Sequence, residues 1–311
     1  MNYFKVLLTI VFCALVFVSC SNELEEHVEP QNLRSNLKRV QFSDQESFLN
    51  SWAELSKMDK QELTNWIDEN NISLSNNGYK NPNIDDVRDY FRALFNIDNE
   101  LQIGDSIIWY NDGQMLLVST NADEDEVNIN KLNPSKCFVF GKIEKEILTV
   151  DEEGAITTRG SLGSSGISSS NQTEFTSTLN PSVKFKYVYE LVSFKNTLAN
   201  ATSYELVFAN KLEWKKNAGF KEASEPRICT TKLSGGVTCE VWGVGVPVNT
   251  TFNVGYNRTD ELAYNQGILL GRVAHPNGSH NFKCWSFSIS CNITQELKGD
   301  PGSRRSASYV M

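Results

Sequence analysis

Cysteine provides the most reactive side chains of this 311-residue chain, and the residues that precede Cys20 form a recognisable pattern. Lys5 precedes an apolar run over residues 6–18, and Ser19 puts a small residue directly before Cys20. This order is typical of an export signal that is cleaved before a cysteine, whose thiol is then acylated. The run is shorter than the roughly 20 residues that cross a bilayer as a helix. The sequence therefore predicts a lipoprotein signal peptide over residues 1–19 and palmitate on Cys20.

A second group of cysteines lies in the last third of the chain: Cys229, Cys239, Cys284 and Cys291. An exported protein meets an oxidising compartment, where an even cluster predicts disulfides, so we expect at least one among these four. A hairpin centred on Ser234 would place Cys229 opposite Cys239, which is the favoured bridge. A two-residue Gly-Gly loop would instead pair Cys229 with Trp242. The alternatives are a bridge to Cys284 or Cys291, and buried free thiols.

Cys284 and Cys291 are not expected to bridge each other. In one continuous strand, seven steps of about 3.3 Å separate their Cα atoms by roughly 23 Å, whereas bridged Cα atoms lie within about 7 Å. The odd spacing also sends the two side chains to opposite faces of the strand. Cys137 stands apart from the other four and is expected to be a buried thiol.

Histidine offers a second candidate chemistry, because His275 and His280 flank Pro276-Asn277-Gly278-Ser279. An Asn-Gly turn pairs the two histidines across adjacent strands, with both rings on one face. Two imidazoles at that spacing can share a transition metal if Cys284 or a carboxylate completes the shell. Two histidines are too few ligands for a metal site. We therefore favour a pair of exposed histidines that bind no metal, and we expect no other cofactor.

Signatures of catalysis are few. Only three histidines are present, which leaves a Ser/His/Asp or Cys/His arrangement almost no base. The sequence has no Gly-rich phosphate loop, dinucleotide fingerprint, HExxH motif or nucleophile elbow. Glycoside hydrolysis needs only two carboxylates, which are abundant here. Four aromatic residues could stack on a sugar, although most large aromatics of a sandwich belong to its core: Trp109, Trp214, Trp242 and Tyr256.

Charge excludes one class of partner. The formal net charge is −9, so the chain offers no basic surface to a phosphate backbone, and nucleic-acid binding is not expected. Asn121, Asp123 and Asp125 place side-chain oxygens at alternate positions, as at the start of a calcium-binding loop. Glu126, however, stands where an EF-hand turn needs Gly, and Leu132 where it needs Glu. We expect an acidic surface loop over residues 121–128.

The elements that position these groups fall into two predicted domains. A polar tether over residues 20–40 leads to an α+β domain over residues 41–157. Ser43 with Glu46, and Asp59 with Glu62, have capping-box spacing ahead of helically spaced apolar residues. A third helix is predicted over residues 87–95. Asn111-Asp112-Gly113 between two β-prone runs predicts a hairpin.

The composition changes after the first domain. Residues 158–182 are rich in Gly and Ser, which favours a flexible linker, although a long surface loop within one domain is the alternative. From residue 183 to 311, apolar and polar residues alternate with period two and no helix is expected. This pattern predicts an all-β, antiparallel, sandwich-like domain. Residues 299–311 form either a disordered tail or a last edge strand.

The first domain also carries a family resemblance, which covers roughly residues 42–119. Its residues include Phe48-Leu49, Trp52, Leu55, Leu63, Trp66, Tyr90-Phe91, Leu94-Phe95-Asn96 and Gln102-Ile103-Gly104-Asp105. This pattern resembles that of cell-envelope lipoproteins from Bacteroidetes whose domain has no assigned function. The resemblance implies an envelope lipoprotein and supplies no catalytic residues. Glu23, Glu25 and Glu26 resemble the surface-export signals of that group.

The sequence therefore predicts a cell-surface protein anchored by lipid to the outer membrane. Its expected role is binding or adhesion without catalysis, with the membrane and a glycan or protein ligand as partners. One alternative is a glycan-processing hydrolase that uses paired carboxylates. The other is a structural component of an envelope assembly, favoured if the terminal β domain has an unpaired strand edge.

Overall fold

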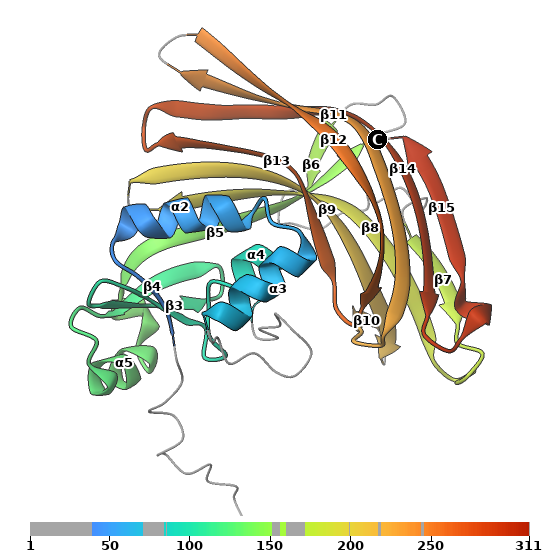
Figure 1. Ribbon diagram of the computed structural model, residues 1–311, viewed down its shortest axis with the longest axis horizontal. Helices are drawn as coiled ribbons and strands as arrows, with labels where there is room; N and C mark the ends of the chain where they lie inside the picture. Colours follow the sequence, from blue (N-terminus) through green and yellow to red (C-terminus); the bar gives the residue numbers. More distant parts are fainter. Residues whose placement is uncertain are drawn as a thin grey trace, which may run out of the picture. The chain divides into compact units, whose positions relative to one another are not determined.

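Two β-sheets dominate the computed structural model (Figure 1), which describes residues 39–70, 84, 86–150, 156–159, 172–198, 200–216, 219–243 and 246–310. All of these residues belong to one compact unit, residues 38–311. The predicted signal peptide, Cys20 and nearly all of the predicted tether lie outside the described residues. The mostly-β fold agrees with the period-two pattern of the sequence.

The larger sheet, sheet A, contains eleven strands in the described part of the chain. They are β1 (Val40–Phe42), β2 (Glu100–Ile103), β3 (Ser106–Asn111), β4 (Gln114–Ser119), β5 (Phe138–Val150), β6 (Ile156–Arg159), β7 (Gln172–Thr176), β8 (Lys184–Leu198), β9 (Ala201–Lys216), β10 (Gly219–Glu222) and β13 (Gln266–Pro276). The main order is β1-β2-β3-β4-β5-β8-β9-β10, while β6, β7 and β13 pair with β5, β8 and β9. Only β1 and β2 pair in parallel among these strands.

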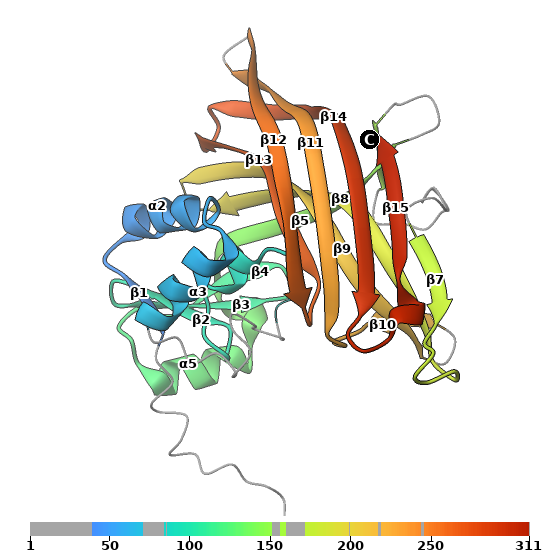
Figure 2. The ribbon, with the colours of Figure 1, turned by 45° about the vertical axis from the view of Figure 1, so that its right-hand side comes forward.

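The smaller sheet, sheet B, has the order β12-β11-β14-β15 and is seen face-on in Figure 2. Its strands are β11 (Arg227–Gly243), β12 (Val246–Leu262), β14 (His280–Leu297) and β15 (Arg305–Val310). The last segment of the chain therefore ends in an edge strand, one of the two alternatives that the sequence left open.

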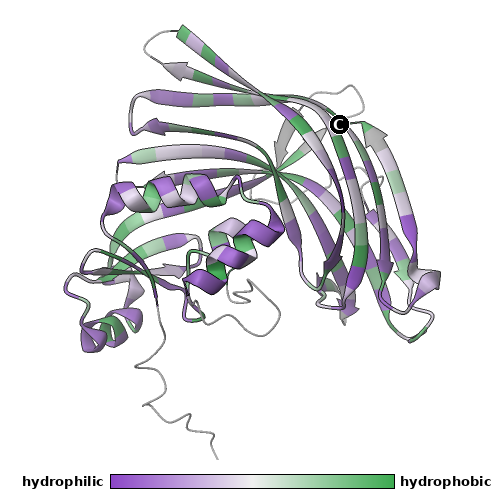
Figure 3. Cartoon of the chain, in the orientation of Figure 1, coloured by the Kyte–Doolittle hydropathy of each residue, from purple (hydrophilic) through white to green (hydrophobic). Residues whose placement is uncertain are grey.

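The inner face of sheet B packs on strands β8 and β9 of sheet A. Along the strands, hydrophobic and hydrophilic residues alternate (Figure 3). Trp285 donates from Nε1 to Ser193 Oγ at 3.1 Å, and the rings of Tyr204 and Phe282 stack with centroids 4.7 Å apart. Both pairs join one sheet to the other across a single apolar core that also includes residues of the helices. The contacts between the sheets thus come from β8, β9 and β14, which all lie within the predicted sandwich-like region, residues 183–311.

The helices are short and lie mostly in the first half of the chain: α2 (Gln45–Leu55), α3 (Lys60–Glu69), α4 (Asp89–Arg92), α5 (Glu124–Lys131), and the 3₁₀ turns η2 (Pro134–Lys136) and η4 (Pro301–Ser303). The predicted Asp59–Glu62 capping box begins α3, with Asp59 N donating to Glu62 Oε2 at 2.7 Å. The box of α2 pairs Asp44 with Ser47 instead, one residue after the predicted start. Trp52 and Phe91 then contact each other in the core, with centroids 5.1 Å apart.

Several predicted boundaries differ from the structure. Sheet A continues from β5 to β8 without a break, so residues 158–182 do not separate two sheets, and they include β7. The third helix is a single turn, α4, rather than residues 87–95. Residues 121–128 are not a loop, because Asp123 caps α5. Each difference arises where tertiary packing or capping overrides a local pattern.

A buried network of charges fastens α4 to sheet A. Arg88 is fully buried and donates from Nη2 to Asp86 Oδ2 at 2.6 Å and from Nη1 to Glu205 Oε2 at 2.5 Å. Tyr90 donates its hydroxyl to the same Glu205 oxygen at 2.8 Å, and Arg272 Nε reaches Glu205 Oε1 at 3.1 Å. Two carboxylates thus face two guanidinium groups. The network joins α4 and the segment before it to β9 and β13.

Arg88 is held on its remaining sides as well. Its guanidinium lies over the ring of Phe194 at 3.8 Å, and Nη1 also donates to Asn196 Oδ1 at 2.9 Å. Burial alone would lower the pKa of Arg88, but the charges of Asp86 and Glu205 raise it. The side chain is therefore charged in the folded protein, and its position in the core depends on both carboxylates.

We expect Arg88→Met to lower the free energy of unfolding by about 3–5 kcal/mol, because it removes the cation from buried Asp86 and leaves buried Glu205 with Arg272 alone. The control is Lys298→Met, which removes an exposed pair with Glu261 and should cost less than about 1 kcal/mol. Urea unfolding followed by circular dichroism measures both. Equal, small losses for the two variants would show that the buried network contributes little.

Candidate functional site

A cavity of about 220 Å³ lies between the α2–α3 turn and strands β12 and β13. We call it the α3–β13 pocket. Its walls combine two tyrosines with charged and amide side chains and a backbone edge: Ser56, Lys57, Met58, Asp59, Lys60, Leu63, Asp89, Tyr90, Tyr256, Arg258, Gln266, Gly267, Ile268 and Leu269. Among the aromatic residues that the sequence singled out, Tyr256 therefore lines a cavity.

The helical wall is set by the capping box of α3. Asp59 Oδ1 accepts hydrogen bonds from the backbone N–H groups of Gln61 and Glu62, each at 2.9 Å. Its second oxygen accepts from Arg258 Nη2 on β12 at 3.3 Å. The backbone bond from Glu62 and the charge of Arg258 lower the pKa of Asp59 against a smaller opposing effect of burial. Asp59 is thus an ionised carboxylate at neutral pH.

The strand wall contains an unpaired acceptor. Tyr256 donates its hydroxyl to Asp260 Oδ2 at 2.9 Å, and Gln266 Nε2 donates to the same oxygen at 3.3 Å. Burial and the charge of Asp260 raise the pKa of Tyr256, which stays protonated. Gln266 is only 7% exposed, and its Oε1 has no hydrogen-bond partner. A buried acceptor without a partner costs free energy, so a ligand that donates to it gains accordingly.

Gly267 lets the chain before α4 approach β13. A Cβ at this position would lie 2.6 Å from the carbonyl oxygen of Val87, closer than packed atoms tolerate. The close approach brings Tyr90 to the pocket, and the register of β13 against β9 shifts between Leu269 and Gly271 at the same wall. Such irregularities in strand pairing commonly change the direction of a side chain next to a binding or active site. The pocket therefore depends on a glycine that the sequence pattern did not mark.

Two carboxylates line the pocket, and their protonation bears on the hydrolase alternative. A glycosidase needs one carboxyl group that is protonated at neutral pH and can donate its proton. Asp59 and Asp89 both line the pocket, but the contacts of Asp59 hold it ionised. The lining also contains Gln266, whose Oε1 is buried without a partner, and the two tyrosines.

The five described cysteines are free in this structure, and the favoured Cys229–Cys239 bridge does not form. Cys229 and Cys239 lie ten residues apart in the uninterrupted strand β11 and therefore cannot meet. Ser234–Gly236 was expected to form a turn, but it pairs with β14 on one side and β12 on the other. A Cβ on Gly235 would lie 2.0 Å from the Ser288 carbonyl oxygen, so this glycine permits a close strand approach rather than a turn.

Cys284 and Cys291 lie on opposite faces of strand β14, as their odd spacing in the sequence predicted. Cys291 is buried in the core, whereas Cys284 is half-buried beside Glu240 on β11, with Sγ 3.9 Å from Oε2. They do not bridge each other, as expected. Cys137 is half-buried rather than buried, and its thiol donates to the carbonyl oxygen of Asn130 at 3.5 Å.

The histidine pair does form. His275 is the second-last residue of β13, His280 begins β14, and their rings stack with centroids 4.0 Å apart. Burial and the neighbouring His280 lower the pKa of His275. The described residues contain no group of three or more His, Cys, Asp or Glu side chains able to hold a metal. The structure thus brings the two weak metal candidates together without a third ligand.

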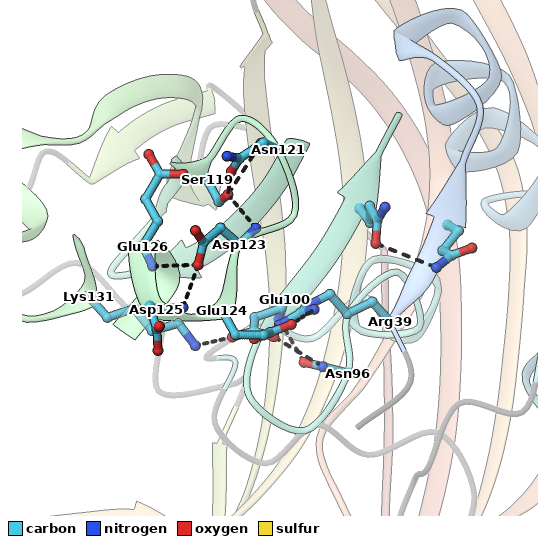
Figure 4. A network of polar contacts seen from close by, with 12 residues as sticks. Arg39, Asn96, Glu100, Ser119, Asn121, Asp123, Glu124, Asp125, Glu126 and Lys131 are labelled. Atoms are coloured by element: carbon cyan, nitrogen blue, oxygen red, sulfur yellow. Dashed lines mark hydrogen bonds and ion pairs between the residues drawn. The ribbon is translucent and has the colours of Figure 1, made fainter. Parts of the chain in front are cut away.

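The acidic residues of the suspected calcium loop are used inside the protein (Figure 4). Asp123 Oδ1 accepts from the backbone N–H of Asp125 at 2.8 Å and caps α5. Glu124 binds Arg39 through both of its oxygens, and Glu100 accepts from Arg39 and Lys131. This network ties the first described residue to α5. Glu100 and Glu124 are thus paired with cations, while Asp123 caps a helix.

The three tryptophans that the sequence singled out lie apart from the α3–β13 pocket. Trp109 is half-buried under Lys131, and Trp214 is half-buried at a separate cavity beside Phe185. Trp242 is 42% exposed near the end of β11. Gln266, the residue with the free acceptor, carried no sequence signal, because its burial and missing partner exist only in the folded chain.

No protein-family model and no curated protein matches this chain. A solved structure that resembles it is the crystal structure of a DUF4848 family protein from Bacteroides thetaiotaomicron. The two are 13% identical, with 88% of this chain and 97% of the other covered, and the TM-score is 0.23. At this score the likeness establishes neither a shared fold nor a function. None of the described helices is long and apolar enough to span a bilayer.

Free thiols give a direct check on the strand register. We expect peptide mapping without reduction to find Cys229, Cys239, Cys284 and Cys291 unbridged. Burial raises the pKa of Cys239 to about 12, so this thiol should react with maleimide only after unfolding, whereas half-buried Cys284 should react in the native protein. Recovery of a Cys229–Cys239 peptide would contradict the continuous β11 strand.

Proposed function

We propose that this protein is a lipid-anchored binding or adhesion protein of the cell surface, and that the α3–β13 pocket is its ligand site. The observation that carries the proposal is the buried, unpaired Oε1 of Gln266 at a pocket that also presents Tyr256 and Tyr90. The predicted anchor at Cys20 and the resemblance to envelope lipoproteins support the location. Residues of the α2–α3 turn and of α3 supply the helical wall of the pocket.

The ligand class follows from the chemistry of the walls. Neutral hydroxyl groups can donate to Gln266 Oε1, and a sugar ring has apolar faces that pack on tyrosine. Arg258 and Asp59 bind each other across the pocket, so neither leaves a strong net charge for a charged ligand. The volume of about 220 Å³ is below the usual range for drug-sized ligands. We therefore propose one unit at the end of a neutral glycan.

Ligand binding can be tested with the chain from residue 21 on, screened against immobilised neutral oligosaccharides and followed by calorimetry on any hit. Gln266→Leu should weaken binding about fivefold to tenfold, since one hydrogen bond contributes roughly 1 kcal/mol. Gln114→Leu, an exposed residue of β4, is the matched control and should leave affinity unchanged. Equal affinity of the two variants for the ligand would place its site elsewhere.

The same screen separates binding from the hydrolase alternative. Chromatography of each oligosaccharide after incubation should show intact substrate, because Asp59 is held as a carboxylate and cannot donate a proton. Appearance of shorter products would support the glycan-processing hydrolase instead.

The anchor is tested separately, by protease treatment of intact cells that carry the wild-type chain or Cys20→Ala. We expect the wild-type protein to be digested from outside and to carry fatty acid. The Cys20→Ala chain should lack the label and be released or misplaced. Protection of the wild-type protein on intact cells would move it to the periplasm.

A further inference from the structure

Strand β12 has a long free edge. It forms one side of sheet B, and among the described strands it pairs only with β11. β12 has 17 residues, whereas β1, β6, β7, β10 and β15 have three to six. In Figures 1 and 2 the β11–β12 hairpin projects beyond the neighbouring strands. Long unpaired edges are templates for another strand.

The two ends of β12 differ. Towards Leu262 the strand is covered by α3, because Arg258 binds Asp59 and Lys60 Nζ donates to the Glu261 carbonyl oxygen at 3.0 Å. No charged residue occurs from Val246 to Asn257. Val246 is 60% exposed and Val248 is 39% exposed, although both belong to the core-facing side of the strand. The usual protections of an edge, charges and bulges, are thus missing over the free half, apart from Pro247 near the tip.

This half is complementary to itself in an antiparallel pair. With a twofold axis at Thr251, Val248 lies opposite Val254 and Thr250 opposite Phe252 on the core-facing side. On the solvent-facing side, Asn249 then lies opposite Asn253. Apolar residues meet apolar or uncharged ones, polar residues meet polar ones, and no like charges meet. An isologous interface requires this kind of self-complementarity.

We propose that β12 pairs with β12 of a second copy of this chain, so that two copies of sheet B form one continuous sheet across a twofold axis. The pairing runs over residues 248–254, where it supplies backbone hydrogen bonds to the free edge and covers Val248. It uses the strand half that does not line the α3–β13 pocket, so both pockets of the dimer stay accessible.

Sedimentation velocity of the chain from residue 21 on tests the proposal. The wild-type chain should be a dimer at micromolar concentrations. The double variant Asn249→Lys with Asn253→Lys puts like charges opposite each other twice, and should raise the dissociation constant at least about tenfold. Asn249→Lys with Asn253→Glu puts opposite charges there and should keep the dimer. The two double variants share Asn249→Lys and differ only at residue 253, which lies on the solvent-facing side of β12.

Ser286→Lys with Ser290→Lys is the charge control, because it adds the same two lysines at the same spacing on the inner strand β14. It should remain dimeric. Hydrogen exchange of amides 248–255 in the wild-type chain should also slow as the protein concentration rises. This measurement tests the β12 pairing without a variant, so it still applies if a variant fails to fold. A monomeric wild-type chain, or equal dissociation of the Lys/Lys and Lys/Glu variants, would overturn the proposal.

Discussion

The structure depends on the burial of Arg88. This guanidinium is fully buried, so its charge is stabilised within the protein, chiefly by the carboxylates of Asp86 and Glu205. Those partners come from the segment before α4 and from β9, which are more than one hundred residues apart. Because a buried ion tolerates little displacement from its partners, the network fixes α4 on sheet A. The position of Tyr90, and thus one wall of the pocket, follows from it.

Strand β12 connects the two proposed activities of the protein. Tyr256 and Arg258 in its second half line the α3–β13 pocket, while its first half is an uncharged edge. The inner face of sheet B is held by contacts to sheet A such as Trp285 with Ser193. Towards Leu262, α3 also covers β12 through Asp59 and Lys60, whereas we propose a second copy at the other half. A lipid-anchored binder that pairs in this way would present two sites to one glycan chain, which raises avidity without new contacts.

The features that the sequence predicted well are those governed by neighbours along the chain. Asn111-Asp112-Gly113 forms its hairpin because Asp112 and Gly113 adopt positive φ values of 47° and 75°. Asp59 and Glu62 cap α3 for a similarly local reason, and the Asn277-Gly278 turn brings His275 to His280. Gly235 was misinterpreted because a glycine marks either a turn or a close approach of another strand, and only the partner strand distinguishes the two. The expected domain boundary also missed the continuity of sheet A, which long-range pairing of β5 with β8 creates.

The sequence by itself determined the mostly-β class of the chain, its main turns and caps, and the faces of its strands, because these depend on residue type and on spacing of two to four positions. It also carries the predicted anchor at Cys20. Only the tertiary structure decided that the thiols stay apart, that Arg88 meets Glu205, and that Gln266 is buried with an unpaired oxygen. These properties arise from segments that are distant in sequence, and burial, ion pairing and cavity formation have no local signal. The proposed ligand site belongs to this second group.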